Sequence, residues 1–150
     1  MRPKEYFLTR GIGQGKNEIE AFEMALRCAG IEKLNLVQVS SIIPGEAKEI
    51  EPEEGIKKLR PGDITFCVMA RKIFKQGTGS AAIGVARGDA DFGYFVEIVR
   101  NDLKAREEAI ETAARLFRSR FGKEPLEVKA VSAEAEADTL TCILACAVLL

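Results

Sequence analysis

Two adjacent serines, Ser40 and Ser41, stand where a predicted strand runs into a turn at Pro44-Gly45. A serine hydroxyl can attack the carbonyl carbon of the preceding residue, which converts the peptide bond into an ester. β-Elimination then releases the upstream chain and leaves dehydroalanine, which hydrolyses to a pyruvoyl group. This shift needs a strained peptide and a polarised carbonyl, and a junction between strand and turn can supply both. An ordinary solvated turn is the alternative interpretation.

A second candidate is Glu97, which lies inside the apolar sequence FGYFVEIV. Apolar neighbours disfavour a charged carboxylate, so we expect the pKa of Glu97 to be raised. A carboxyl group of that kind suits a proton donor near neutral pH. Alternatively, Glu97 points to solvent from an edge strand.

Three glycines, Gly11, Gly13 and Gly15, precede a predicted helix. They could cradle a phosphate at the start of that helix. Their spacing is not GxGxxG and no P-loop Lys-Ser/Thr follows, so we predict a flexible turn. Glu23 in the helix and Asn35 in the next strand are, taken alone, an ordinary solvated position and an ordinary polar position.

The chain contains no histidine. Ser-His-Asp and Cys-His catalysis are therefore excluded, as are metal sites that use histidine. A proton donor must come from Glu, Asp, Tyr, Cys or Lys. The net charge of -1 gives no electrostatic case for binding nucleic acid or an anionic membrane.

The compartment is predicted from what the sequence lacks. The N-terminus has no apolar signal-peptide core, and the most apolar stretch, 139–150, is too short to span a bilayer as a helix. We therefore expect a cytoplasmic protein. Its cysteines have apolar neighbours and are predicted to be buried free thiols: Cys28, Cys67, Cys142 and Cys146.

Patterns of apolar and turn residues predict a single α+β domain over 1–150. The first predicted helix runs from an Asn17 cap to Gly30, with Glu20 completing a capping box. Its predicted apolar face is Ile19, Phe22, Leu26 and Cys28, with Ala25 and Ala29 filling in. The second runs from an Asp102 cap to Phe121. Residues 46–61 are predicted to be a charged surface excursion and 133–138 an acidic loop. The predicted strands cover 4–9, 34–40, 64–70, 80–87, 92–99, 126–132 and 139–149.

Several segments, taken in order, resemble the pyruvoyl-dependent arginine decarboxylase family. They are YFLTRGIGQG, AFEMALRCAGI, NLVQVSSIIPGEA, LRPGDITFCVMA, GSAAIGVA and GYFVEI. The NLxxVSSIxP segment is the most specific of these. The resemblance implies an αββα four-layer sandwich and self-cleavage into a β chain, 1–40, and an α chain, 41–150.

The resemblance also implies roles for individual residues. Ser40 and Ser41 form the cleavage site, and Ser41 becomes the covalent pyruvoyl cofactor. Glu97 is the implied proton donor and Asn35 assists processing. Glu23, together with Ser40 and Ile42, is implied to contact the substrate, although the family usually has Asp where this chain has Glu23.

The implied reaction converts L-arginine to agmatine and CO2, through a Schiff base between the substrate amine and the pyruvoyl group, in polyamine synthesis. It needs no pyridoxal phosphate and no metal. The implied assembly is a homotrimer, or a hexamer of two trimers, with active sites between protomers. The alternatives are the same chemistry on another basic amino acid, and an unprocessed paralogue without catalysis.

Overall fold

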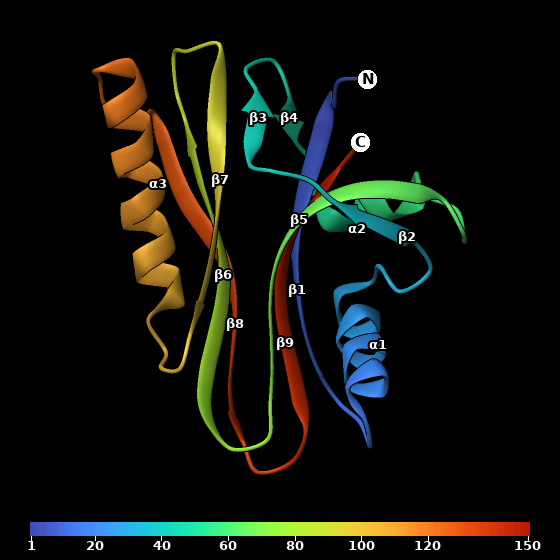
Figure 1. Cartoon of the computed structure of the whole chain (residues 1–150). Helices are drawn as coiled ribbons and strands as arrows, with labels where there is room; N and C mark the ends of the chain where they lie inside the picture. The colour runs from blue at the N-terminus through green and yellow to red at the C-terminus, as the bar shows by residue number, and fades with distance from the viewer.

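Two β-sheets lie face to face in the computed structural model, which describes residues 1–150 (Figure 1). The first sheet has the strand order β2 (Asn35–Gln38), β5 (Ile64–Phe74), β9 (Thr141–Leu149), β1 (Glu5–Gln14) and β4 (Lys48–Glu49). The second has the order β3 (Ile42–Pro44), β7 (Phe92–Arg100), β6 (Gly77–Arg87) and β8 (Glu127–Ala137).

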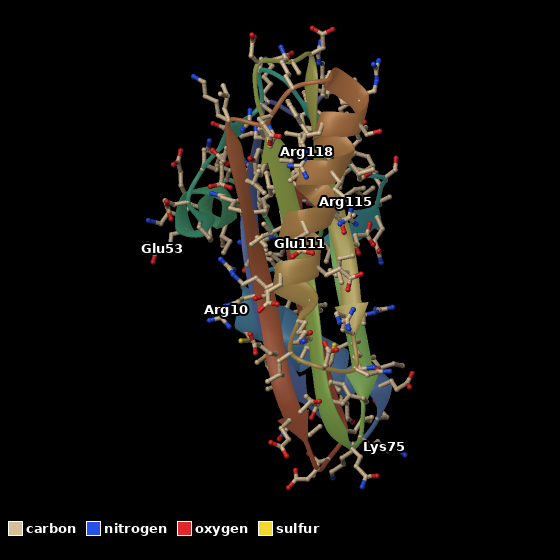
Figure 2. The ribbon with its side chains drawn as sticks, turned by 90° about the vertical axis from the view of Figure 1, so that its left-hand side faces the viewer. Arg10, Glu53, Lys75, Glu111, Arg115 and Arg118 are labelled. Atoms are coloured by element: carbon tan, nitrogen blue, oxygen red, sulfur yellow. The ribbon has the colours of Figure 1, made fainter.

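Helices cover the outer faces of both sheets. α1 (Glu18–Ala29) and α2 (Pro52–Lys57) pack on the first sheet, and α3 (Ala105–Phe121) packs on the second. Figure 2 shows that the charged side chains Glu111, Arg115 and Arg118 project from α3. None of these helices combines the length and the apolar character needed to cross a membrane. The predicted α+β class and its αββα layering are confirmed.

The central core lies between the sheets, and β9 shows why its sequence is apolar throughout. Alternate residues of a strand point to opposite faces. Ile143, Ala145 and Ala147 therefore enter the core between the sheets. Leu144 and Cys146 enter a second core under α1. A strand buried on both faces needs no polar positions, which explains the run TCILACAVL.

The ends of α1 are placed as predicted, and its buried face matches the prediction in part: Ala25 and Ala29 are buried, whereas Ile19 and Cys28 are exposed. The Asn17 side chain accepts a hydrogen bond from the Glu20 amide at 2.9 Å, and Gly30 ends the helix with a φ of 78°. The buried face consists of Ala21, Ala25 and Ala29. Ile19 is 82% exposed. Cys28 is also exposed, so its predicted burial is wrong, whereas Cys67, Cys142 and Cys146 are buried as predicted.

Close packing of α1 on β1 explains this choice of small residues. Gly11 and Gly13 belong to β1 rather than to the predicted flexible turn. A Cβ atom on Gly11 would lie 2.0 Å from the Ala25 carbonyl oxygen, and one on Gly13 would lie 2.2 Å from the Ala25 nitrogen. Glycines on the strand and alanines on the helix let the two backbones approach, and larger apolar residues are left at the helix flanks.

Several boundaries differ from the prediction: β1 extends to Gln14, β5 extends to Phe74, and β3 was not predicted as a separate strand. Residues 46–61 contain β4 and α2, and β8 continues as a strand to Ala137 because its alanines and glutamates alternate between buried and solvated sides. Asp102 precedes the start of α3: it accepts a hydrogen bond from the Lys104 amide at 2.9 Å and pairs with Arg100. The helix itself begins at Ala105 and ends at Phe121, with Gly122 as its C-terminal cap.

Candidate active site

The Ser40–Ser41 peptide lies where the chain crosses from one sheet to the other (Figure 1). Just before it, the Val39 amide donates to the Cys67 carbonyl of β5 at 2.9 Å. Just after it, the Phe95 amide of β7 donates to the Ser41 carbonyl at 2.8 Å. The first sheet therefore holds one side of the peptide and the second sheet holds the other.

The peptide itself is free of internal partners. Ser40 is exposed and Ser41 is half-buried. No backbone or side-chain group of the chain donates to the Ser40 carbonyl oxygen. Positive φ angles occur only at glycines. Neither serine therefore shows the backbone strain that a positive φ would indicate. Within one chain, the two sheets position the peptide but supply no donor to polarise its carbonyl.

An apolar cavity of about 360 Å³ adjoins Ser40. Ile42, the first residue of β3, is 47% exposed and lines the cavity beside Ser40. The other residues that line this cavity are Met1, Pro3, Val39, Phe66 and Leu149. The predicted substrate contacts Ser40 and Ile42 thus share one opening at the crossing.

Glu97 lies on β7, two residues beyond the Phe95 amide that binds Ser41, which corresponds to about 7 Å along the strand. Phe95 and Glu97 share the face of β7 that points toward the first sheet, where Phe95 is buried. β3 pairs with β7 only from Phe92 to Tyr94, so Glu97 lies past the end of β3 and is exposed. Partial burial nevertheless raises the pKa of its carboxyl group, in the direction predicted.

Glu23 lies on a different surface, on α1. Its Oε1 accepts a hydrogen bond from Arg27 Nε at 2.9 Å, one helical turn away. It lines a cavity of about 400 Å³ with Phe22 and Arg71. The Arg71 guanidinium lies 4.4 Å from the centre of the Phe22 ring. Arg71 was not predicted from the sequence because the predicted strand ended at Ala70. Arg71 alternates along β5 with Cys67 and Met69, which face α1, so its side chain lies on the α1 side of the sheet.

Asn35 lies at the start of β2, at the opposite end of that strand from Ser40. Its Nδ2 donates to the Gly62 carbonyl at 2.8 Å, and its backbone amide donates to Asp63. It lines a cavity with Phe22 and Leu26, both of which also border the Glu23 cavity. Within one chain the candidate residues therefore form two groups: Ser40, Ser41, Ile42 and Glu97 at the crossing, and Glu23 and Asn35 on the surface of α1 and β2.

The structure contains no cluster of three or more Cys, Asp and Glu side chains placed to hold a metal ion. The fold and site define an αββα protein whose serine pair is held between its two sheets. Residues 5–150 match the family described as pyruvoyl-dependent arginine decarboxylase.

Curated relatives agree with this match. The chain is 37% identical to pyruvoyl-dependent arginine decarboxylase 1 of Archaeoglobus fulgidus, covering 99% of this chain and 98% of the relative. It is 43% identical to the pyruvoyl-dependent arginine decarboxylase of Thermoplasma volcanium, covering 80% and 70%. It is 42% identical to a probable one of Chlorobium limicola, covering 81% and 71%. The chain belongs to the pyruvoyl-dependent arginine decarboxylase family, which confirms the resemblance.

Proposed function

We propose that the chain cleaves itself between Ser40 and Ser41 and then converts L-arginine to agmatine and CO2, in polyamine synthesis in the cytoplasm. The single domain becomes a β chain, 1–40, and an α chain, 41–150. The observation that carries this proposal is the serine peptide tied to one sheet through Val39 and to the other through Ser41. Membership of a family named for a pyruvoyl group and for arginine supports both the cofactor and the substrate.

The cleavage consumes Ser41. Its Oγ bonds to the Ser40 carbonyl carbon, the C–N bond breaks, and the hydroxyl proton ends on the Ser41 nitrogen. Loss of the Ser41 α-proton then expels the Ser40 carboxylate and leaves dehydroalanine. Addition of water and release of ammonia give the pyruvoyl carbonyl at position 41, so Ser40 becomes the C-terminus of the β chain.

The residues at the crossing fit a pyruvoyl group at position 41. A pyruvoyl carbonyl supplies an electron sink for the bond that releases CO2, without pyridoxal phosphate or a metal. The apolar residues beside Ser40 and Ile42 would give the substrate carbons an apolar surface to pack against. Glu97 holds a proton at a carboxyl whose raised pKa keeps it protonated to higher pH, and it delivers that proton to the α-carbon.

The substrate guanidinium is proposed to bind Glu23 of a neighbouring protomer. A homotrimer, or a hexamer of two trimers, would bring the surface that carries Glu23 and Asn35 against the crossing of the next chain. In that assembly Asn35 assists the cleavage. The exposed apolar residues around Glu23, such as Ile19, support burial of this surface between protomers.

A different basic amino acid is the second candidate substrate. Glu23 already shares Oε1 with Arg27, and Arg71 lines the same cavity. A guanidinium fork uses both carboxylate oxygens, whereas the single ammonium of lysine or ornithine can bind at one. Because Arg27 already occupies one oxygen of Glu23, the site suits a substrate ammonium better than it would if both carboxylate oxygens were free.

Intact-mass measurement of two matched variants tests the cleavage. Ser41→Ala removes the attacking hydroxyl and should leave one uncut chain of 150 residues. Ser40→Ala keeps that hydroxyl and should still give two chains, the larger with a blocked pyruvoyl N-terminus that reacts with a carbonyl probe. A wild-type chain that stays uncut and unlabelled would support the unprocessed paralogue and end this proposal.

The same preparations decide the substrate. CO2 release from arginine, lysine and ornithine should be fastest with arginine and absent from Ser41→Ala. Faster release from an amino acid that lacks a guanidinium would replace arginine with that substrate and leave the cleavage proposal intact.

A further inference from the structure

Arg87, the last residue of β6, joins three parts of the chain at one end of the core between the sheets. It alternates with the buried residues Ile83 and Val85, so its side chain points between the sheets. Its Nη1 donates to the Tyr6 hydroxyl at 3.1 Å. Its Nη2 donates to the carbonyl oxygens of Gly45, at 3.3 Å, and of Ala47.

The carbonyls that Arg87 binds belong to the second crossing between the sheets. Residues 45–47 connect β3 in the second sheet with β4 in the first. β3 is an edge strand of three residues that pairs only with β7, and its last residue, Pro44, has no amide hydrogen to donate. The strand that begins just after Ser41 therefore has few bonds of its own, and Arg87 fixes its far end.

A continuous set of contacts joins Arg87 to the serine peptide. The Tyr6 ring, which is fully buried, meets the Phe95 ring edge-on with 5.1 Å between ring centres. The amide of Phe95 is the donor to the Ser41 carbonyl. Arg87 thus binds the strand after Ser41 at one end, and through Tyr6 it packs against the residue that binds the other end.

We propose that Arg87 is a positioning residue for cleavage at Ser40–Ser41. By binding the connection that follows β3 and by packing through Tyr6 on Phe95, it keeps Ser41 Oγ aligned with the Ser40 carbonyl carbon. In the step that it assists, the Oγ–C bond forms, the Ser40–Ser41 C–N bond breaks, and the hydroxyl proton ends on the nitrogen. This inference rests on the self-cleavage proposed above. Arg87 touches neither reacting atom, so its effect must come through the placement of β3.

The test compares cleavage rates of freshly synthesised chains. Wild type, Arg87→Met, Arg87→Lys and Arg106→Met are made in a cell-free system, and conversion to the two pieces is followed by gel and mass at a temperature below every unfolding midpoint. Arg106 is the matched control because its Nη1 also donates to a backbone carbonyl, that of Ala130, but away from the crossing. Thermal unfolding is measured on the same variants.

Arg87→Met should cleave about 10- to 100-fold more slowly than wild type, because a misplacement of reacting groups by about 1 Å can cost about 100-fold in rate. Arg87→Lys, which keeps the charge but cannot bind all three oxygens, should recover part of the rate. Arg106→Met should cleave like wild type. If Arg87→Met is too unstable to assay, slower cleavage by folded Arg87→Lys is the expected result.

Two results would overturn the assignment. One is a cleavage rate for Arg87→Met that equals the wild-type rate, or such a rate for Arg87→Lys if Arg87→Met does not fold. The other is a loss of rate that follows the unfolding midpoint equally in the Arg87 and Arg106 variants. A wild-type chain that never cleaves would instead remove the proposed function, so the two failures are separable.

Discussion

The carboxyl group of Glu97 is accessible and yet partly desolvated, because it lies past the end of β3 on the face of β7 that turns toward the first sheet. Burial raises its pKa, and the protonated form is therefore favoured in the folded chain. The unfolded chain binds this proton less tightly. Stability from Glu97 is thus complete below the unfolded pKa and is lost as pH rises through the folded pKa.

Glu97→Gln tests this carboxyl as the proton donor. Cleavage should proceed, whereas decarboxylation should fall about 100-fold, since a general acid contributes at least that factor. In wild type the rate should decline as pH rises through the raised pKa, and this decline should disappear in the variant. CO2 release is measured as a function of pH. The control is Glu134→Gln, which removes an exposed carboxyl on β8 and should leave both the rate and its pH dependence unchanged. Full activity of Glu97→Gln would move the donor role to another residue.

At the scale of elements, the packing of α1 on β1 decides which side chains fit beneath the helix. Gly13→Ala would place a Cβ atom 2.2 Å from the Ala25 nitrogen, and that backbone cannot yield as a flexible side chain does. We expect a loss of about 1–3 kcal/mol in the free energy of unfolding. Gln14→Ala, exposed on the same strand, should change it by less than about 0.5 kcal/mol. Urea unfolding measures both, and an unchanged Gly13→Ala would mean that α1 shifts easily.

The same contact shows where sequence patterns succeed and where they fail. Asn17, Glu20, Gly30 and Gly122 act through neighbours close in sequence, so the ends of α1 and the end of α3 were predictable. The buried face of α1 depends on glycines of β1, and their role appears only once strand and helix are packed. The apolar pattern therefore included Ala25 and Ala29 correctly but also added Ile19 and Cys28, which are exposed, and missed Ala21, because the close approach allows only alanine beneath the helix.

The candidate site shows the same difference between what local sequence predicts and what only the packed structure shows. The identities of Ser41 and Glu97 were predicted from local chemistry and from the resemblance. Their common location was not, because it depends on the pairing of Ile42 with Tyr94 across two strands distant in sequence. Arg87 gave no local signal at all, since its partners lie 40 to 81 residues away.

At the scale of the whole molecule, one flank is charged and another is apolar. α3 presents charged side chains such as Arg115 to solvent (Figure 2). The surface formed by α1, β2 and the start of β5 instead exposes large apolar residues: Ile19, Met24, Val37 and Ile64, which are 82%, 43%, 40% and 71% exposed. Exposed apolar patches are typical of interaction surfaces, which supports the assembly proposed above.

We expect sedimentation to give a trimer, or a hexamer built from two, and Val37→Asp to give single chains with little decarboxylation. A buried charge without a partner opposes association at such a surface. Leu126→Asp is the control, because Leu126 is 82% exposed but lies outside this surface. Full activity in monomeric Val37→Asp would show that each chain holds a complete site.

The position of β1 would give the proposed cut after Ser40 a lasting consequence. Residues 1–40 supply β1, which pairs with β9 from Tyr6 to Gln14 inside the first sheet, together with α1 and β2. After that proposed cut, the protein would be a non-covalent complex of two peptides that had folded as one chain. Its unfolding would separate them, and regain of structure would depend on the concentration of both pieces. The intact precursor would be the only species able to find the fold by a unimolecular route.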